Sequence, residues 1–248
     1  MKKFTSICFL AVMLTLLTGC LMVSSIGGTG GGYIVQGSGE IVSRDFTVGI
    51  FTGIDIEGAY VVVYTSSQIN AVTVSMHENL FDYLEVSVNR SGVLEIRSTR
   101  PFRTSRNNTP RVYISAPYLN EIHIGGALTT EGWDTIRTQH LTMNAAGAAS
   151  ATIDMEVDML SITVAGAGTF DLSGNAATAN IIIAGAGSVD AEDLQTRTAT
   201  LNLAGAGNAV IAVSDVLNVT ISGVGTVHYI GDPQVNRTIA GLGTVRQR

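Results

Sequence analysis

Apolar and polar residues alternate over short stretches in the second half of the chain. Clear cases are Ile122-His123-Ile124, Ile162-Thr163-Val164 and Leu201-Asn202-Leu203. Because the side chains of a strand point alternately to its two faces, this period of two predicts strands with one buried face. The run Ile181-Ile182-Ile183 breaks the alternation, and we expect its coil to be covered on both sides.

A glycine flanked by small residues follows each of these stretches. These glycines recur at spacings of 18 to 21 residues, at Gly126, Gly147, Gly166, Gly185, Gly205, Gly223 and Gly241. Such a period, with two or three short strands per coil, predicts an all-β fold, a parallel β-solenoid resembling a β-helix. A leucine-rich repeat has a similar period, but its Leu/Asn consensus is missing here. Glycine at a corner is expected to supply either a positive φ or a close approach of two backbones.

A small polar residue stands shortly after each corner glycine, and the position after it is mostly apolar. The polar set comprises Thr129, Ser150, Thr169, Ser188, Asn208, Thr226 and Thr244. In stacked coils we expect this set to form one column, in which each side chain can hydrogen-bond to the equivalent residue one coil away.

The N-terminal half of the mature chain is less regular. The segment from Tyr33 to Val63 has the pattern of strands with a first corner at Gly58, and residues 78–84 are expected to form one helical turn. We therefore divide the chain into a signal peptide (1–19), a Gly-rich tether (20–32), an N-terminal β part (33–120) and a repeat solenoid (121–248).

The composition fits an all-β protein and argues against several function classes. Of 248 residues, 46% are hydrophobic and 14% are charged, which is too apolar for a disordered chain. The net charge of -6 argues against general nucleic-acid binding. The lysines are Lys2 and Lys3, so none is left for catalysis once an N-terminal signal is removed. No Gly-Ala run completes a nucleotide-binding motif, so no cofactor is expected.

The N-terminus has the three-part layout of a secretory signal. Met1-Lys2-Lys3 is basic, residues 4–17 are apolar, and Leu17-Thr18-Gly19-Cys20 resembles a bacterial lipoprotein box. This resemblance implies cleavage before Cys20 and a lipid anchor on its thiol, which holds the protein to a membrane. Since neither Leu21 nor Met22 is acidic, we expect the outer membrane of a Gram-negative envelope. The alternatives are a signal cut elsewhere or an uncleaved anchor.

Motifs spread over nearly the whole mature chain match one family. They are Gly37-Ser38-Gly39, Arg44-Asp45-Phe46, residues 51–58, Val72-Thr73-Val74, residues 78–84, Val112-Tyr113-Ile114, Pro117-Tyr118-Leu119 and the Gly-Ala repeats. With them the chain resembles the bacterial "putative auto-transporter adhesins" with a head GIN domain. The resemblance implies a β-helix-like all-β fold and a cell-envelope location, and it carries no catalytic residues. The family often has Ser-Gly-Ala-Ser at the corner, whereas this chain mostly has Ala-Gly-Ala-Gly.

Paired carboxylates are the main candidates for catalysis or metal binding. Asp171 and Asp190 occupy equivalent positions in adjacent coils, and such pairs serve sugar hydrolysis or calcium binding. The next coils place Val210 and His228 there, so we favour a solvated pair beside a turn. The histidines lack metal-ligand spacing, and no metal site is predicted. They are His77, His123, His140 and His228.

Five arginines form the main concentration of positive charge. They are Arg97, Arg100, Arg103, Arg106 and Arg111, in a turn-rich stretch expected to be an exposed loop. Because guanidinium groups bind phosphates and carboxylates in pairs, they are a candidate site for an anionic glycan or another acidic envelope component. The alternative, which we favour, is that they pair with the protein's own carboxylates.

Taken together, these patterns predict a non-enzymatic lipoprotein of the cell envelope, an adhesin or binding module that presents a solenoid surface. The alternative is a carbohydrate-active enzyme, a polysaccharide lyase or hydrolase on a β-helix scaffold. That enzyme would need Asp, Glu, Lys or Arg clustered on one solenoid face, and the repeats are poor in these residues. The sequence leaves the oligomeric state open.

Overall fold

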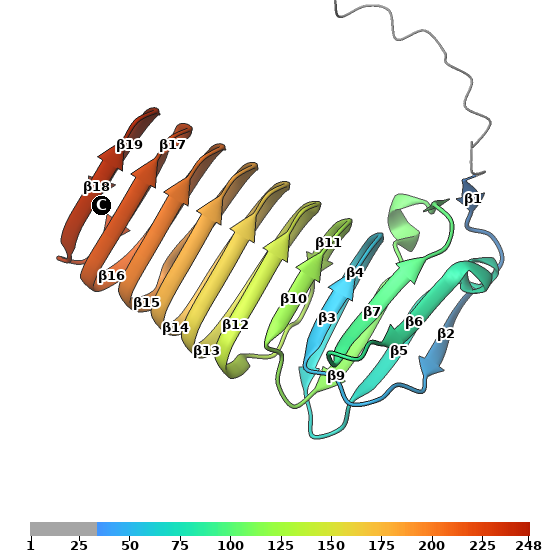
Figure 1. Ribbon diagram of the computed structural model, residues 1–248. Helices are drawn as coiled ribbons and strands as arrows, with labels where there is room; N and C mark the ends of the chain where they lie inside the picture. The colour runs from blue at the N-terminus through green and yellow to red at the C-terminus, as the bar shows by residue number, and fades with distance from the viewer. Residues whose placement is uncertain (1–33) are drawn as a thin grey trace, which may run out of the picture. The chain divides into compact units, whose positions relative to one another are not determined.

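The computed structural model describes residues 34–248, which form one compact unit. The predicted signal peptide, Cys20 and the tether lie outside the described residues, so the expectations for them stay predictions. The predicted fold class is confirmed. Seventeen of the 19 strands build one sheet that winds as a parallel β-solenoid, and the other two form a small separate sheet (Figure 1).

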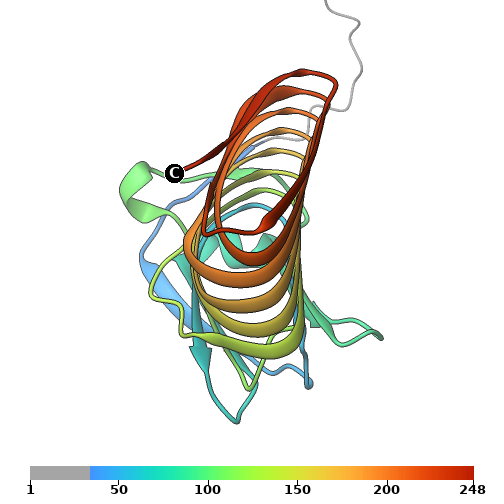
Figure 2. The ribbon, with the colours of Figure 1, turned by 90° about the vertical axis from the view of Figure 1, so that its left-hand side faces the viewer.

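Each coil of the repeat runs along one side of the solenoid, turns at a corner glycine and returns along the other side. Figure 2 looks along the stack from its C-terminal end and shows the coils as flattened, superposed loops. Four long strands bend around a whole coil and so contribute to both sides. The strands of the repeat are β10 (Glu121–Ile124), β11 (Ala127–Thr130), β12 (Ile136–Ala145), β13 (Ala148–Val164), β14 (Ala167–Ile183), β15 (Ala186–Leu203), β16 (Ala206–Ile221), β17 (Val224–Ile230), β18 (Gln234–Ile239) and β19 (Leu242–Gln247).

Parallel pairing between neighbouring coils, with short register shifts in two of the ladders, holds the coils together. Ile162 pairs with Ile181, and Ile181 pairs with Leu201. All three side chains are buried, so they form a column inside the coil. Burying one such side chain contributes about 1.5–3 kcal/mol, and the interior columns therefore supply the main stabilisation of the stack. Their alternation with exposed residues is the period of two seen in the sequence.

The corner glycines form one column, as predicted. A Cβ atom on Gly166 would stand 1.9 Å from the carbonyl oxygen of Gly147, and one on Gly185 would stand 2.0 Å from that of Gly166. The same contact recurs at every corner from Gly126 to Gly241. None of these seven glycines has a positive φ. Glycine is therefore required here because neighbouring backbones approach too closely for any side chain.

The polar residues that follow the corners also line up on the outer surface, as predicted. Thr169 pairs with Ser188, and Ser188 pairs with Asn208. Further along the column, the Thr226 amide donates to Asn208 Oδ1 at 3.2 Å, and Thr244 Oγ1 donates to Thr226 Oγ1 at 3.5 Å. The expected hydrogen bonds between coils thus occur toward the C-terminal end.

The N-terminal part inserts a coil into the stack out of chain order. Strands β3 and β4 form a coil that pairs on one side with β10 and β11, and on the other with β7 and β9. After β4 the chain leaves the stack, forms β5, η1 and β6, and returns through β7. The elements of this part are β1 (Val35–Gln36), β2 (Ile41–Phe46), β3 (Gly53–Ile56), β4 (Ala59–Ser66), β5 (Ala71–His77), the 3-10 helix η1 (Glu78–Tyr83), β6 (Leu84–Val88), β7 (Val93–Ser98), β8 (Phe102–Arg103), the 3-10 helix η2 (Arg106–Asn108) and β9 (Arg111–Ala116).

The two ends of the stack are closed differently. At the N-terminal end, β5 pairs antiparallel with β9 and β2, and β6 pairs antiparallel with β7, so the parallel coils stop there. The helix η1 confirms the predicted helical turn and adds Leu80 and Phe81 to the core. At the C-terminal end, β18 and β19 are edge strands. Arg237 takes there the position that Val219 fills one coil earlier.

Candidate functional site

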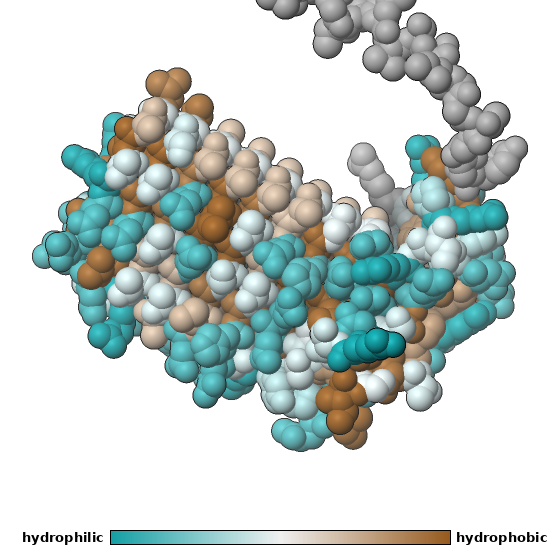
Figure 3. Space-filling model, viewed as in Figure 1, coloured by the Kyte–Doolittle hydropathy of each residue, from teal (hydrophilic) through white to brown (hydrophobic). Residues whose placement is uncertain are grey.

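The outer surface of the strand segments that lead up to the corner glycines is the most regular surface of the molecule. We call it face A; it is the surface turned to the viewer in Figure 3. Two columns of outward side chains run along it. The first comprises Glu121, Thr142, Ser161, Asn180, Thr200, Asn218 and Asn236, and the second comprises His123, Asn144, Thr163, Ile182, Asn202, Thr220 and Thr238.

From β12 to β18, neither column of face A contains an ionisable side chain. Hydroxyl and amide groups repeat there at the spacing of neighbouring strands, about 4.8 Å. Near the C-terminal end, Asn236 Nδ2 donates to Asn218 Oδ1 at 3.0 Å. Apart from Ile182, both columns of face A thus present neutral hydrogen-bonding side chains from β12 to β18.

Ile182 is the apolar exception in the second column. It lies between Thr163 and Asn202 and is partly exposed, whereas Ile181 and Ile183 are buried in the interior. The prediction that its coil is covered on both sides is therefore wrong. The alternation of the strand places Ile182 outward, and its apolar side chain is tolerated on the surface.

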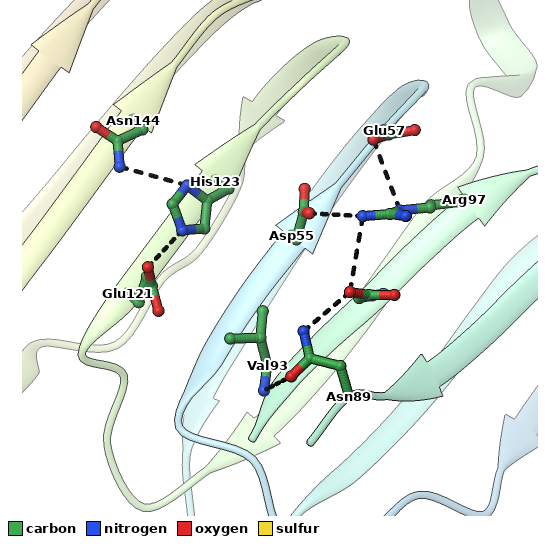
Figure 4. Close-up of polar contacts among 9 residues, drawn as sticks. Asp55, Glu57, Asn89, Val93, Arg97, Glu121, His123 and Asn144 are labelled. Carbon is green, nitrogen blue, oxygen red and sulfur yellow. Dashed lines mark hydrogen bonds and ion pairs between the residues drawn. The ribbon is translucent and has the colours of Figure 1, made fainter. Parts of the chain in front are cut away.

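The N-terminal end of face A is charged and centres on Arg97. Its Nη2 lies 3.0 Å from Asp55 Oδ2 and 3.7 Å from a carboxylate oxygen of Glu95 (Figure 4). Its Nε lies 3.6 Å from Glu57 Oε1. The hydrogen bond to Asp55 and the charge of Glu57 raise the pKa of Arg97 above its ordinary value. Three carboxylates of the protein thus compensate this guanidinium.

His123 joins the charged end to the neutral columns. Its Nε2 lies 2.6 Å from Glu121 Oε1, and its Nδ1 lies 3.3 Å from Asn144 Nδ2 (Figure 4). If Asn144 donates to Nδ1, the ring carries its proton on Nε2 and donates it to Glu121. Residues 34–248 hold no group of three His, Cys, Asp or Glu side chains arranged to bind a metal ion.

The five arginines of the predicted anion site are spread over several elements. Arg97 lies in β7 and Arg111 in β9, so the expectation of one exposed loop is wrong for these two. Arg111 Nη2 lies 3.0 Å from Glu131 Oε2, and this hydrogen bond raises the pKa of Arg111. Both strand arginines therefore pair with the protein's own carboxylates, because strand pairing brings those carboxylates beside them.

The other three arginines belong to different parts of the chain. The guanidinium of Arg100 lies 5.5 Å from the centre of the Tyr83 ring, within cation–π range. Arg103 is exposed in β8, which pairs in parallel with β1. Arg106 begins η2. The five arginines thus belong to β7, the β7–β8 connection, β8, η2 and β9.

A groove borders face A where the N-terminal part meets the repeat. Its volume is about 590 Å³, within the range of small-molecule sites. It lies between the β9–β10 connection and the start of β12. The lining residues are Tyr118, Asn120, Glu121, Arg137, Thr138, Gln139, His140 and Thr142.

The groove exists because one coil lacks a strand segment. The pairing of β10 with β12 starts only at Thr142, whereas β12 already pairs with β13 from Ile136. In the described chain, the residues of β12 before Leu141 therefore have a strand partner on the β13 side only. Thr138 Oγ1 crosses the gap and donates to Asn120 Oδ1 at 2.6 Å.

The charges in the groove compensate one another. Arg137 makes a two-point contact with Glu156, with Nε to Oε2 at 3.0 Å and Nη2 to Oε1 at 3.2 Å. This hydrogen-bonded pair raises the pKa of Arg137. Glu121 adds a further negative charge to the lining. Tyr118, 45% exposed, supplies the phenol ring of the lining, and His140 supplies an imidazole.

The remaining predicted residues lie apart from this groove. Asp171 pairs with Asp190 in adjacent coils, and Val210 and His228 continue the column, as the repeat predicts. This column follows the corners on the side of the coil opposite face A. Cys20 lies outside the described residues. In the described part of the chain, no helix is long and apolar enough to span a membrane.

A comparison with protein families matches residues 50–233 to the family described as "putative auto-transporter adhesin, head GIN domain". The chain belongs to this family. The matched range of the head GIN domain spans the inserted β3–β4 coil, the groove and most of face A. No curated protein matches the chain. The family assignment supports an adhesin-like, non-enzymatic role at the cell envelope or surface.

Solved structures share the head GIN fold seen here. A "putative adhesin" from Bacteroides fragilis has a TM-score of 0.78 at 21% identity, covering 86% of this chain and 100% of its own. A "putative lipid binding protein" from Parabacteroides distasonis has a TM-score of 0.66 at 21% identity, covering 87% of this chain and 100% of its own. A "putative adhesin" from Parabacteroides merdae has a TM-score of 0.60 at 20% identity, covering 86% and 98%. At these identities the likeness concerns the fold.

Sequence reasoning missed the groove of the head GIN domain. Tyr118 belongs to a family motif and His140 lacks metal-ligand spacing, and neither pattern indicates a groove. The groove forms because the β9–β10 connection meets a strand that begins without a partner, and no periodic pattern marks that meeting. An available signal was the interval from Gly126 to Gly147, the longest between successive corners of the repeat.

Proposed function

We propose that this head GIN protein is a non-enzymatic binding module of the cell envelope, anchored by a lipid on Cys20 and presenting face A to its partner. The observation that carries the proposal is the neutral surface from β12 to β18, whose two columns hold Thr, Asn and Ser side chains at every position except Ile182. The family, and a solved structure of the same fold described as a putative adhesin, support this role.

The geometry of face A suits binding to a long, repetitive partner. Side chains held on paired strands lose little conformational freedom when they bind. The free energy gained from weak contacts is therefore not cancelled by the entropy cost of ordering the side chains. Equal spacing lets one partner chain engage several coils at once, and such multivalent contacts add avidity. Isolated surface hydroxyls on loops would lack both advantages.

Binding fits the described residues better than catalysis or lipid uptake. Glycoside hydrolysis needs two carboxylates flanking the bond, whereas the groove lining offers Glu121, with Glu156 tied to Arg137. Storage of an acyl chain needs an apolar cavity. The coil interior is instead filled by packed side chains such as Ile181, Leu201 and Phe170, all fully buried.

Membrane attachment is tested with the full-length chain in a Gram-negative host. We expect the wild type to incorporate labelled palmitate and to sediment with outer membranes, and Cys20→Ala to do neither. Label on the Cys20→Ala variant, or wild-type protein recovered unlabelled, contradicts the anchor.

Binding is tested with isolated envelope polysaccharides and a glycan array. Charges placed on face A by Thr163→Glu and Asn202→Glu should abolish binding. The matched pair Thr169→Glu and Ser188→Glu, on the opposite side of the coil, should retain it. Equal binding by both pairs argues against face A, and cleavage of any glycan in the same assay overturns the non-enzymatic role.

A further inference from the structure

We infer that the groove beside Tyr118 is a binding subsite for a neutral glycan, an uncharged oligosaccharide whose chain continues along face A. The inference rests on the proposed function and names the ligand class of that surface. It goes beyond the family assignment, which assigns no ligand.

The charges in and beside the groove disfavour an anionic ligand. The guanidinium of Arg137 is neutralised by its two contacts with Glu156, at 3.0 and 3.2 Å. Glu121, which lies 2.6 Å from His123 Nε2, is the carboxylate of the lining. A carboxylated or sulfated polymer would meet repulsion from Glu121 and would have to displace Glu156 from Arg137. An uncharged ligand avoids both penalties.

The lining of the groove combines an aromatic ring with polar side chains. Besides Tyr118, the lining contains the amide side chains of Asn120 and Gln139 and the hydroxyl side chains of Thr138 and Thr142. Amides and hydroxyls both donate and accept hydrogen bonds, as the hydroxyl groups of a sugar require. The ring provides an apolar surface with a polar tip, against which the C–H face of a pyranose can pack. Such a lining suits a sugar ring.

An unpaired edge of β12 borders the groove. Before Leu141 this strand has a partner only on the β13 side, so backbone groups on its other side face the groove. A peptide could in principle add to such an edge. However, the Thr138–Asn120 hydrogen bond crosses the gap, and the lining holds no apolar pocket for alternate peptide side chains besides the Tyr118 surface. The edge therefore favours a glycan.

The groove is continuous with face A. Glu121 and Thr142 belong both to the groove and to the first column of face A. Beyond Thr142 this column carries only neutral Ser, Asn and Thr side chains. A glycan with one ring against Tyr118 can extend along the column without meeting a charge.

The test uses the full mature chain in detergent and titrates neutral hexasaccharides of glucan, mannan, xylan and galactan type against polygalacturonate and heparin. We expect at least one neutral oligosaccharide to bind, with little dependence on salt. Tyr118→Ala should weaken it by about tenfold, because the stacking surface is lost, while Tyr118→Phe should retain it. Tyr113→Ala, at a tyrosine of similar exposure in β9, is the matched control and should bind like the wild type.

Several outcomes overturn the inference. These are binding of the anionic polymers alone, binding of an extended peptide in the groove, absence of binding to every neutral glycan, or neutral-glycan binding that Tyr118→Ala leaves unchanged. The proposed function is judged separately by attachment to isolated envelopes and by the face A variants. Loss of binding in those variants, with no effect of Tyr118→Ala, would refute the subsite and leave the function standing.

Discussion

Gly126 lies directly against Gly58: a Cβ atom on Gly126 would stand 2.0 Å from the Gly58 carbonyl oxygen. The Ala127 amide also donates to that oxygen, at 2.7 Å. Between these two glycines the chain leaves the stack, builds the antiparallel N-terminal end and returns. The contact sets the register in which the repeat begins, and all later corners continue the same column.

The corner contact predicts strong intolerance of side chains at the glycines. A methyl group on Gly185 would stand 2.0 Å from the Gly166 carbonyl oxygen and 2.3 Å from that of Ala165. We expect Gly185→Ala to lower the free energy of unfolding by roughly 1–3 kcal/mol through overpacking. Urea denaturation followed by circular dichroism measures it. Gly49→Ala is the control, since nothing lies within 4 Å of a Cβ there; equal stability of both variants would contradict the corner model.

We expect the buried hydroxyl of Tyr60 to lower the stability of the fold at alkaline pH. Its hydroxyl is buried without a hydrogen-bond partner, and burial raises the pKa of Tyr60 from 10.0 to about 12. The unfolded chain therefore loses this proton first. Stability is intact below pH 10.0 and falls as the pH rises toward about 12.

We expect Tyr60→Phe to match or exceed the wild type in free energy of unfolding at pH 7, because an unpaired buried hydroxyl is removed. Its advantage should grow above pH 10 by up to about 1.4 kcal/mol per pH unit. Urea unfolding at neutral and alkaline pH, with the exposed Tyr118→Phe as control, provides the check. A Phe variant clearly less stable at pH 7 would show that the hydroxyl is satisfied.

We expect Arg97 to stabilise the fold by an amount that depends on the salt concentration. Without its guanidinium, the carboxylates of Asp55, Glu57 and Glu95 would repel one another. We expect Arg97→Met to lower the melting temperature at low ionic strength, and 0.5 M NaCl to reduce the difference by screening. Arg246→Met is the comparison variant. An Arg97 variant that keeps its melting temperature but loses binding to polygalacturonate would instead support an external anion site.

We expect Arg237 to limit self-association of the protein at the C-terminal edge of the stack. It occupies an inward column position at the end of the stack, where earlier coils hold Ile181, Leu201 and Val219. An inward charge on an edge strand discourages pairing with another chain. We expect Arg237→Val to increase self-association, measured by light scattering after size exclusion. The outward Arg246→Val in β19 should change it less, and identical behaviour of both variants would refute this role.

The arginine stretch shows where sequence reasoning reaches its limit. Its composition indicated both an anion site and, as the favoured alternative, pairing with internal carboxylates. Which carboxylate faces Arg97 depends on the pairing of β7 with β3, which places Asp55 beside it. That pairing joins segments far apart in the chain, and no local pattern encodes it. The same holds for Arg111 and Glu131.

The sequence by itself determined the solenoid, its corner glycines and its polar columns. Each coil meets a neighbour with nearly the same pattern, so the local alternation and period already describe the surroundings of every repeat residue. Only the tertiary structure decided the inserted β3–β4 coil, the antiparallel N-terminal end, the partners of the arginines and the groove beside Tyr118. Those features depend on contacts between unlike segments, whose geometry follows from packing and chain connectivity rather than from a repeated pattern.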